Sequence, residues 1–583
     1  MRVLLLHPDD DFDGSWTRQH WDSVIDLGRA PKVLYDERSA ALGCSVFSVF
    51  DLAIEVGDMQ IWRHLFQPGM ERVVDRFGID WWDVISIVLQ PELQDVRLAF
   101  RLAEMLSGCR TLAVSRPSAM AEALRLELGI PLQVVNRGLP RRVVQSVLRR
   151  GGAVADLSFV QLRQVVYDKY DPHYRWRRKL AGSTTQSSKS EPESEPVVLL
   201  PSAYSNVTKT ALSYARVLPE QKFLLVLARE SGAVLPLPAN VQTADLASFA
   251  AKQCDRNELQ KLEACWKQME QSLAEHPAFK LPVQLGILKR GLRWLRWGLA
   301  VRDAWIRVFE TRAVAGCLSA DDSNPYTRIP LLLAGQRGIP AVACHHGALD
   351  CHRAFKNPRF SNYLAKGEME RDYLEHICGV DAGRIRIGAA TWPPRENASL
   401  WSEGGPWITF FTEPYETDFW RAEAIYRELL PRLCAAARGS GKSVVLKLHP
   451  FESARQRLRL VARTLSERDR RLVSVTDAPL SREILQKTWC AVTVESTVAC
   501  ECASVGIPAF LCGWLRHAYA GYAPQYVRFG AGRMLEFPDD LLCIPDMLGA
   551  ALPGSDAARR LAQPISPDAL SEVLLQPQAS GLK

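Results

Sequence analysis

Short apolar runs alternate with amphipathic stretches in the first part of the chain. The runs RVLLL, DVISIVL, TLAVS and LQVV predict four buried strands, and QDVRLAFRLAEML has the periodicity of a helix. Strands that alternate with helices favour a mainly parallel sheet covered by helices. Residues 1–181 are therefore predicted to form an α/β domain.

A polar segment, GSTTQSSKSEPESEP, then interrupts the pattern and predicts a flexible linker at residues 182–196. Strands are predicted again at VVLLPS, KFLLVLAR, AVAGCLS and IPAVAC, with a mostly helical stretch from Leu246 to Arg307. The second α/β domain is predicted to span residues 197–364.

A third α/β pattern follows in residues 365–583. Its predicted strands are RIRIGAA, PWITFFTEP, SVVLKLHP, RLVSVTD, CAVTVEST and IPAFLCG. Two doubly wound domains in series would leave a cleft between facing strand ends, where open parallel sheets bind ligands. The sequence thus predicts two Rossmann-like domains preceded by an additional N-terminal α/β domain.

Composition and charge narrow the class of protein. The chain has 47% hydrophobic and 23% charged residues, as expected for a folded globular protein. A net charge of +7 over 583 residues, with no recognisable binding module, argues against nucleic acid as a partner. The 14 cysteines show no disulfide-scaffold spacing, and the N-terminal MRVLLLHPDDDFDG turns acidic too early for a secretory signal, so we expect a cytoplasmic protein.

The predicted strand SVVLKLHP ends in basic residues that could bind an anion. Pro450 cannot continue a strand and biases His449 toward an extended conformation, which presents the imidazole at the carboxyl edge of the sheet. There it could donate to a phosphate oxygen or, alternatively, bond a backbone group. Lys447, two residues earlier, suits either a salt bridge or a phosphate contact.

A second strand, AVTV, runs into Glu495, Ser496 and Thr497, whose hydroxyl groups suit the cap of a helix that begins at Val498. A helix N-terminus carries unpaired N–H groups and the positive end of the dipole, which together bind phosphate. Glu501, one turn further, could accept bonds from a sugar diol. The alternative is an ordinary crossover helix.

The order KLHP, ESTVACE and GIPAFL, with RGIPAVACHHGALD upstream, resembles the GT-B glycosyltransferases and polymer-forming transferases of bacterial surface polysaccharide synthesis. The closest pattern is that of the CDP-glycerol glycerophosphotransferases, with similar features in polysialyltransferases and capsular Kdo transferases. The resemblance spans residues 196 to 550. It implies a GT-B arrangement of the two Rossmann-like domains and a donor nucleotide held by His449, Ser496, Thr497 and Glu501.

The acceptor side departs from that pattern. His345, His346 and Gly347 stand where the glycerophosphotransferase group tends to show Gln-His-Gly. The acidic base motif of sialyltransferases has its nearest counterpart in DFDG at residues 11–14, in the first domain. We expect His346 or Asp350, with His345 as a further candidate, to remove the proton of an acceptor hydroxyl. An alternative makes His346 a phosphate or acceptor ligand.

Two further patterns contain residue types that bind metals. CHHGALDCH contains zinc-ligand types, but neighbouring residues cannot easily form a tetrahedral set. ADDSN, Asp321 to Asn324, suits Mg²⁺, acceptor hydroxyls or simply a capped turn. No metal and no cofactor besides the nucleotide-activated donor are expected.

A basic and aromatic stretch, Ile287 to Phe309, places arginines on one helical face and tryptophans with leucines on the other. This pattern is typical of an interfacial helix on anionic lipid, and equally of a helix packed on its own domain. The candidate membrane contacts are Arg293, Trp294, Arg296 and Trp297. A second such segment lies at Tyr167 to Leu180.

The sequence therefore predicts a metal-independent glycosyltransferase that moves a sugar from a nucleotide-sugar donor to a capsule or lipopolysaccharide acceptor, glycan or lipid-linked, at the cytoplasmic membrane face. The alternatives are a polyol-phosphate transferase with a CDP-polyol donor, a nucleotide-sugar epimerase and a non-catalytic scaffold of the same fold.

Overall fold

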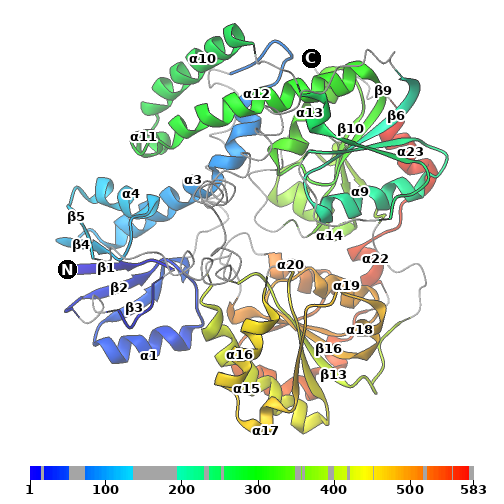
Figure 1. Cartoon of the computed structure of the whole chain (residues 1–583). Helices are drawn as coiled ribbons and strands as arrows, with labels where there is room; N and C mark the ends of the chain where they lie inside the picture. The colour runs from blue at the N-terminus through cyan, green and yellow to red at the C-terminus, as the bar shows by residue number, and fades with distance from the viewer. Residues whose placement is uncertain are drawn as a thin grey trace, which may run out of the picture.

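The computed structural model describes residues 1–8, 10–14, 19–51, 73–135, 193–228, 236–250, 255–347, 349, 356, 362–390, 399–415, 420–450, 452–515, 522–554 and 556–576. They contain three parallel sheets, which we call the first, second and third units in chain order (Figure 1). Asp350, the segment Tyr167–Leu180 and residues 182–192 of the predicted linker lie outside these ranges.

The first unit has the strand order β3-β2-β1-β4-β5. Its strands are β1 (Arg2–Leu6), β2 (Ser23–Asp26), β3 (Ser45–Ser48), β4 (Thr111–Val114) and β5 (Leu132–Val134), and its helices are α1 (Lys32–Leu42), α3 (Trp81–Met105) and α4 (Ala119–Leu128). The four-residue strands β2 and β3 were not predicted. The predicted strand DVISIVL is wrong, because it forms the start of α3, where the Asp80 side chain caps the helix by accepting from the Trp82 N–H at 3.0 Å.

The second unit has the order β12-β11-β10-β9-β6-β7-β8. Its strands are β6 (Glu193–Ser202), β7 (Phe223–Leu227), β8 (Val241–Asp245), β9 (Arg312–Ser319), β10 (Ala341–Ala343), β11 (Asn362–Ala365) and β12 (Ile385–Ile387). Its helices include α9 (Ser205–Val217), α10 (Arg256–Ala274), α11 (Pro277–Gln284), α12 (Ile287–Thr311), α13 (Pro325–Gln336) and α14 (Glu368–Asp372).

Two boundaries of this unit differ from the prediction. Strand β6 begins at Glu193, so residues 193–196 of the predicted linker are already strand. RIRIGAA, assigned to the third domain, instead supplies β12, which pairs in parallel with β11. That assignment was wrong because a strand's partner is set by long-range pairing and not by its place in the chain.

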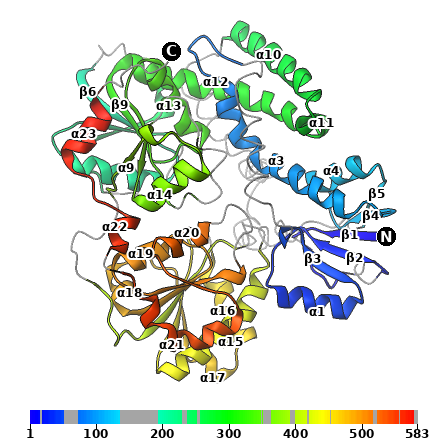
Figure 2. The same ribbon diagram turned by 180° about the vertical axis from the view of Figure 1, so that it is seen from behind.

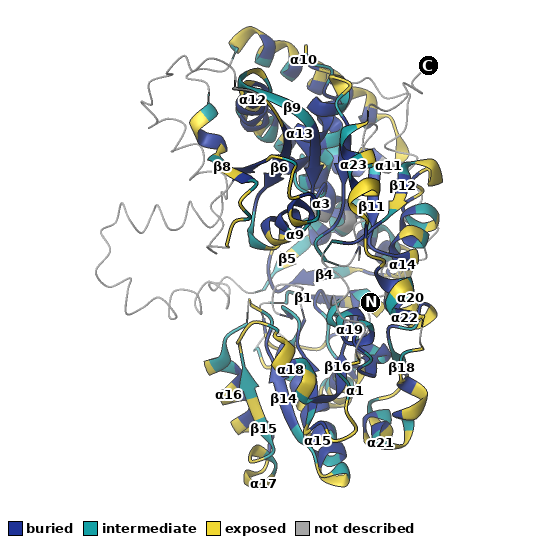
Figure 3. Cartoon of the chain, turned by 90° about the vertical axis from the view of Figure 1, so that its right-hand side faces the viewer, coloured by how far each residue is buried: buried dark blue, intermediate teal, exposed yellow. Residues whose placement is uncertain are grey.

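The third unit has the order β15-β14-β13-β16-β17-β18. Its strands are β13 (Trp407–Phe411), β14 (Ser443–Lys447), β15 (Val473–Thr476), β16 (Thr488–Thr493), β17 (Ala509–Cys512) and the unpredicted β18 (Arg533–Leu535). Helices α15 (Ala422–Ser440), α16 (Ala454–Thr464), α18 (Arg482–Lys487), α19 (Val498–Ser504) and α20 (Tyr522–Arg528) surround it. The central strands of this sheet are buried, as parallel strands covered on both faces should be (Figure 3).

After the third unit the chain returns to the second. Helix α22 (Ala557–Leu561) lies beside α19, and α23 (Pro567–Leu575) packs on β9 (Figure 1). The Ala389 N–H donates to the Gln563 carbonyl at 2.7 Å, and a Cβ on Gly316 would collide with the Leu574 carbonyl oxygen. Two facing Rossmann-like units joined by a returning C-terminal segment are the GT-B arrangement, and the predicted α/β fold is confirmed.

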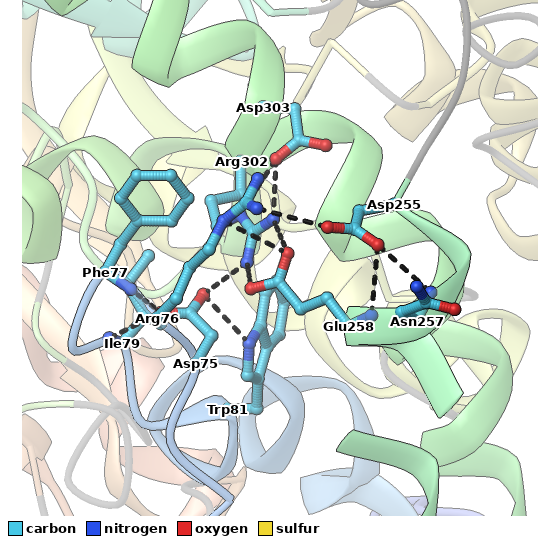
Figure 4. Close-up of polar contacts among 10 residues, drawn as sticks. All are labelled: Asp75, Arg76, Phe77, Ile79, Trp81, Asp255, Asn257, Glu258, Arg302 and Asp303. Atoms are coloured by element: carbon cyan, nitrogen blue, oxygen red, sulfur yellow. Dashed lines mark hydrogen bonds and ion pairs between the residues drawn. The ribbon is translucent and has the colours of Figure 1, made fainter. Parts of the chain in front are cut away.

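The first unit is fastened to the second through a buried ionic cluster (Figure 4). Arg302 on α12 is fully buried and donates to Asp75 at 2.7 Å, to Glu258 on α10 at 2.7 and 2.8 Å, and to Asp303 at 2.6 Å. Asp75 precedes α3 and also accepts from the Trp81 indole at 3.2 Å. Because the carboxylates are paired, the cluster holds the start of α3 against the second unit.

The first unit also contacts the third, as the view from behind shows (Figure 2). Arg421, immediately before α15, donates to both carboxylate oxygens of Asp26 at 2.6 and 2.7 Å and to the Asp10 carbonyl at 2.8 Å. Its guanidinium lies 4.6 Å from the centroid of the Phe12 ring. The first unit thus bridges the two Rossmann-like units.

Candidate active site

The chain order of the strands locates a switch point in each of the two Rossmann-like units. In the second unit the chain adds β7 and β8 on one side of β6 and then returns to place β9 on the other side. In the third unit β14 and β15 lie on one side of β13, and β16 lies on the other. Ligands of open α/β sheets bind outside the carboxyl ends of strands at such points.

At the second unit's switch point three polar side chains meet. The Tyr204 hydroxyl, beyond β6, donates to Asp321 Oδ2, beyond β9, at 2.5 Å. The same hydroxyl oxygen lies 3.5 Å from His346 Nε2, and the two rings meet edge to face with centroids 5.2 Å apart. His346 Nδ1 is enclosed without a hydrogen-bond partner among the described residues. The predicted base candidate thus stands beside a carboxylate for which the sequence suggested Mg²⁺, acceptor hydroxyls or a capped turn.

The charge state of His346 follows from its surroundings. Burial lowers the pKa of its imidazole below the usual value; the Asp321 carboxylate raises this pKa, whereas the ammonium groups of Lys366 and Lys356 lower it further. The net direction is downward, so the ring is neutral at pH 7. A neutral imidazole can accept a proton, as a general base must.

The remaining residues of ADDSN are structural. Asn324 caps α13 by accepting from the Tyr326 N–H at 2.9 Å. The Asp322 carboxylate is fully buried, pairs with the Lys356 ammonium and accepts from the Tyr363 hydroxyl at 2.7 Å. The capped-turn interpretation is confirmed for Asn324 and for Asp321, whose Oδ1 accepts from the Ser323 N–H at 2.8 Å while its Oδ2 accepts from Tyr204.

In the third unit a buried carboxylate organises the loop after β14. The His449 N–H donates to Thr412 Oγ1 at 3.0 Å and to Glu452 Oε2 at 3.2 Å. Glu452 also accepts from the Tyr426 hydroxyl at 3.1 Å and from Arg457 at 2.7 Å, and its side chain is fully buried. The sequence analysis missed Glu452, although it stands two residues after Pro450 in LHPFE.

The two basic residues of this loop differ in what they contact. The Lys447 ammonium donates to the Leu448 carbonyl at 2.7 Å, so its contact is with neither of the partners predicted for it. Burial lowers the pKa of His449, and the neighbouring Lys447 lowers it further. His449 is therefore neutral at pH 7 with one ring N–H to donate, while Pro450 is exposed beside it.

At the switch point of the third unit lies Glu413, which the sequence analysis also missed. Its Oε1 accepts from the Glu495 N–H at 2.7 Å and from the Thr493 hydroxyl at 3.2 Å. Helix α19 begins at Val498 as predicted, but Thr497 makes no side-chain cap. Instead the Ser496 hydroxyl oxygen accepts from the Val498 N–H at 3.3 Å. Glu413 thereby fixes the approach to α19.

Glu501, on α19, faces the second unit. Burial raises the pKa of its carboxyl group, and the Lys209 and Lys366 ammonium groups lower it in part. Lys209 belongs to α9 and Lys366 follows β11, so both charges come from the second unit. His345 is buried, and its ring centroid is 4.6 Å from that of His346. Of the predicted donor residues, Glu501 is therefore the one whose charge environment includes the second unit.

Of the membrane contacts predicted on α12, the structure contradicts that of Trp297, and the others stay predictions. Trp297 is 5% exposed and packs edge-on against Tyr326 with ring centroids 4.6 Å apart, and Trp294 is half-buried against the same core. Arg293 is exposed, and Arg296 pairs with Glu263 at 2.5 Å. The apolar face of this helix is its core face. Across the described ranges, helices long and apolar enough to cross a bilayer are absent.

The described residues contain no group of three or more histidine, cysteine or acidic side chains that could hold a metal ion. The candidate site is thus built from two histidine-bearing loops and one short helix.

No family model matches the chain, and no curated protein matches it. Solved structures with a similar fold include CalG4, the calicheamicin glycosyltransferase, at 12% identity and a TM-score of 0.35 over 65% of this chain and 97% of that one. UDP-GlcNAc 2-epimerase from Neisseria meningitidis has 11% identity and a TM-score of 0.35, over 65% of this chain and 97% of that one. A variant of the wall teichoic acid polymerase TagF has 10% identity and a TM-score of 0.33, over 73% of this chain and 95% of that one. At these TM-scores the function has to be inferred from the site itself.

Proposed function

We propose that the protein is a glycosyltransferase that moves a sugar from a nucleotide-sugar donor to a hydroxyl group of a cell-surface polysaccharide acceptor. The observation that carries the proposal is the polar group of side chains at each of the two switch points. A neutral histidine beside Tyr204 and Asp321 lies at the strand ends of the second unit, and the His449 loop with helix α19 lies at the strand ends of the third.

The donor is assigned to the third unit. The His449 ring N–H would contact the diphosphate, with the hydroxyl groups of Ser496 and Thr497, just before α19, beside it. Glu501 would accept hydrogen bonds from the ribose hydroxyls. These contacts stabilise the charge that develops on the leaving nucleotide phosphate, which is the role of preorganised donors in catalysis.

The acceptor is assigned to the second unit. His346 takes the proton of the acceptor hydroxyl as its oxygen forms a bond to the anomeric carbon of the donor sugar. The bond from that carbon to the phosphate oxygen breaks, and its electron pair leaves with the nucleotide. Asp321 stabilises the imidazolium that forms, because its negative charge raises the pKa of His346. No step in this scheme needs a metal ion or another cofactor.

Nucleotide binding tests the donor half of the proposal. Thermal stabilisation of the full chain by CMP, CDP, UDP and GDP should single out one nucleotide, and His449→Ala should abolish the shift. His376→Ala is the matched control, because that side chain is 65% exposed and pairs with Asp372 on the rim of the second unit. Loss of the shift in both variants, or no shift with any nucleotide, would contradict the donor site.

Product analysis then separates the alternatives. A transferase releases nucleotide from its donor only when an acceptor glycan is present, whereas an epimerase interconverts nucleotide sugars without net release. Stabilisation by CDP or CMP alone would point to transfer from a CDP-polyol or CMP-sugar donor, because the phosphate contacts are the same. A chain that binds a nucleotide but shows neither activity would be a binding or scaffold protein.

A further inference from the structure

The loop that carries His346 is held by one buried lysine. Lys366 follows β11, and its ammonium donates to the carbonyl of His345 at 2.7 Å, to the carbonyl of Gly347 at 3.0 Å and to Glu370 Oε1 at 2.6 Å. Glu370 Oε2 accepts in turn from the Lys366 N–H at 2.7 Å. A lysine ammonium has three N–H donors, so these three acceptors use all of them. Lys366 therefore serves the protein backbone rather than a phosphate.

These contacts fix the backbone on both sides of His346. With the carbonyl groups of His345 and Gly347 tied to the same nitrogen, the peptide plane before His346 and the peptide plane after Gly347 are held in a fixed relation to each other. The imidazole is thereby aimed at Tyr204 and Asp321.

Lys366 is also connected to the returning C-terminal segment. Its carbonyl accepts from the Gln563 N–H at 2.8 Å, and Gln563 lies just beyond α22, which packs beside α19. Its positive charge acts on Glu501 of α19 as well as on His346. The side chain is 9% exposed, so this connection is internal to the protein.

We propose that Lys366 is a positioning residue that holds the His345–Gly347 loop and so orients His346 toward the acceptor hydroxyl. The orienting role toward an acceptor rests on the proposed function, whereas the hold on the loop does not. Without the ammonium the loop relaxes, and a misplacement of about 1 Å at a catalytic group can cost about 100-fold in rate.

The test compares Lys366→Met with Lys366→Arg and Lys209→Met in the full chain. Lys209→Met is the matched control, because it removes a positive charge that acts on Glu501 without touching the loop. The first readout is the rate of carbethoxylation of His346 by diethyl pyrocarbonate at alkaline pH, where its imidazole is neutral in every variant, followed by peptide mass spectrometry. It needs no substrate. Lys366→Met should raise this rate, because a released loop exposes the enclosed ring to the reagent, and Lys209→Met should leave it unchanged.

The second readout is the kinetics of nucleotide release from the donor that the binding experiment selects. Lys366→Met should lower kcat at least roughly 10-fold with KM within about twofold, because the lost effect is orientation and not donor binding. Lys366→Arg, which keeps the charge and can still donate to the loop, should recover most of the rate. If Lys366→Met does not fold, the double variant Lys366→Met with Glu370→Gln removes the carboxylate left unpaired.

The outcomes separate the two proposals. An unchanged carbethoxylation rate of His346 in Lys366→Met overturns the hold on the loop, whether or not the protein transfers sugar. A raised carbethoxylation rate with wild-type kcat overturns the orienting role. A raised carbethoxylation rate in a protein that binds no nucleotide supports the hold on the loop and counts against the proposed function alone.

Discussion

The first and second units both carry a buried carboxylate at the carboxyl ends of their strands, but the two carboxylates have opposite kinds of partner. In the first unit, Asp26 at the end of β2 and the Asp10 carbonyl beyond β1 accept from Arg421 of the third unit. In the second unit, Asp321 beyond β9 accepts from the Tyr204 phenol at 2.5 Å and lies next to a neutral imidazole.

The difference shows that the topology of a parallel sheet decides where polar side chains gather, namely at the carboxyl ends of the strands. The partners of those side chains then decide whether that edge of the sheet docks another unit or can bind a ligand. Asp26 is fully buried against an arginine, which is the arrangement of a docking contact. His346 instead lies in a group of polar side chains with Tyr204 and Asp321, where its neutral ring could accept a proton. We therefore interpret the first unit as a structural domain that connects the other two units, and not as a second catalytic domain.

The largest effect should come from breaking the docking contact. Arg421→Met leaves the buried Asp26 carboxylate without its cation, and we expect a loss of about 3–5 kcal/mol in the free energy of unfolding. Arg427→Met on the same helix is the control, because its side chain is 58% exposed and its pair with Glu423 should contribute only about 0.5 kcal/mol. Urea denaturation measures both. Equal transition midpoints for the two variants would contradict the docking role.

At the second unit's switch point the effect should fall on turnover instead. We expect His346→Ala to lower the rate of acceptor-dependent nucleotide release by roughly 10²–10⁴-fold, because a general base contributes about that factor. Nucleotide affinity should stay unchanged, since the donor is assigned to the third unit. Full turnover in this variant would remove His346 from the mechanism and leave Asp321 as the next candidate.

A pair of tyrosines gives a closer comparison, because each donates to a buried carboxylate at the strand ends of its own sheet. The Tyr35 hydroxyl reaches Asp26 at 3.1 Å, and the Tyr204 hydroxyl reaches Asp321 at 2.5 Å. Each phenylalanine variant loses one hydrogen bond, worth about 1 kcal/mol. Tyr35→Phe should lower stability by about that amount without changing turnover, and Tyr204→Phe should slow turnover roughly fivefold. The reverse pattern, seen in unfolding and rate measurements, would exchange the roles of the two edges.

The sequence predicted the parts of this comparison that depend on local signals. Strands that stop at polar residues placed His346, His449 and the start of α19 at strand ends, and all three lie there. The pattern could not assign RIRIGAA to its sheet, because pairing between β11 and β12 is non-local.

The pattern of apolar and polar residues could not predict what surrounds a buried segment either. DVISIVL is a short apolar run, and such a run reads the same as a buried strand or as part of a buried helix. In α12, the alternation of arginine and tryptophan could not distinguish a lipid surface from the protein core as the partner of the apolar face. In the structure Trp297 contacts Tyr326 and Arg296 pairs with Glu263, so the helix packs on the protein. Glu413 and Glu452 were missed because they act on backbone N–H groups, for which no residue spacing is diagnostic.

The smallest effect we expect is a displacement of the pH profile. Burial depresses the pKa of His346, so its neutral form persists below pH 6.5 or so, the usual midpoint for histidine, and turnover should be lost only as the pH falls through the depressed value. Asp321→Asn removes a negative charge that raises this pKa, so the acid limb of kcat/KM should move to still lower pH. Asp26→Asn removes the equivalent charge from the first unit and should leave the limb where it is. An acid limb that moves to higher pH in Asp321→Asn would mean that the titrating group is not His346. The strand ends of the second unit would then lose the catalytic imidazole that distinguishes them from those of the first unit.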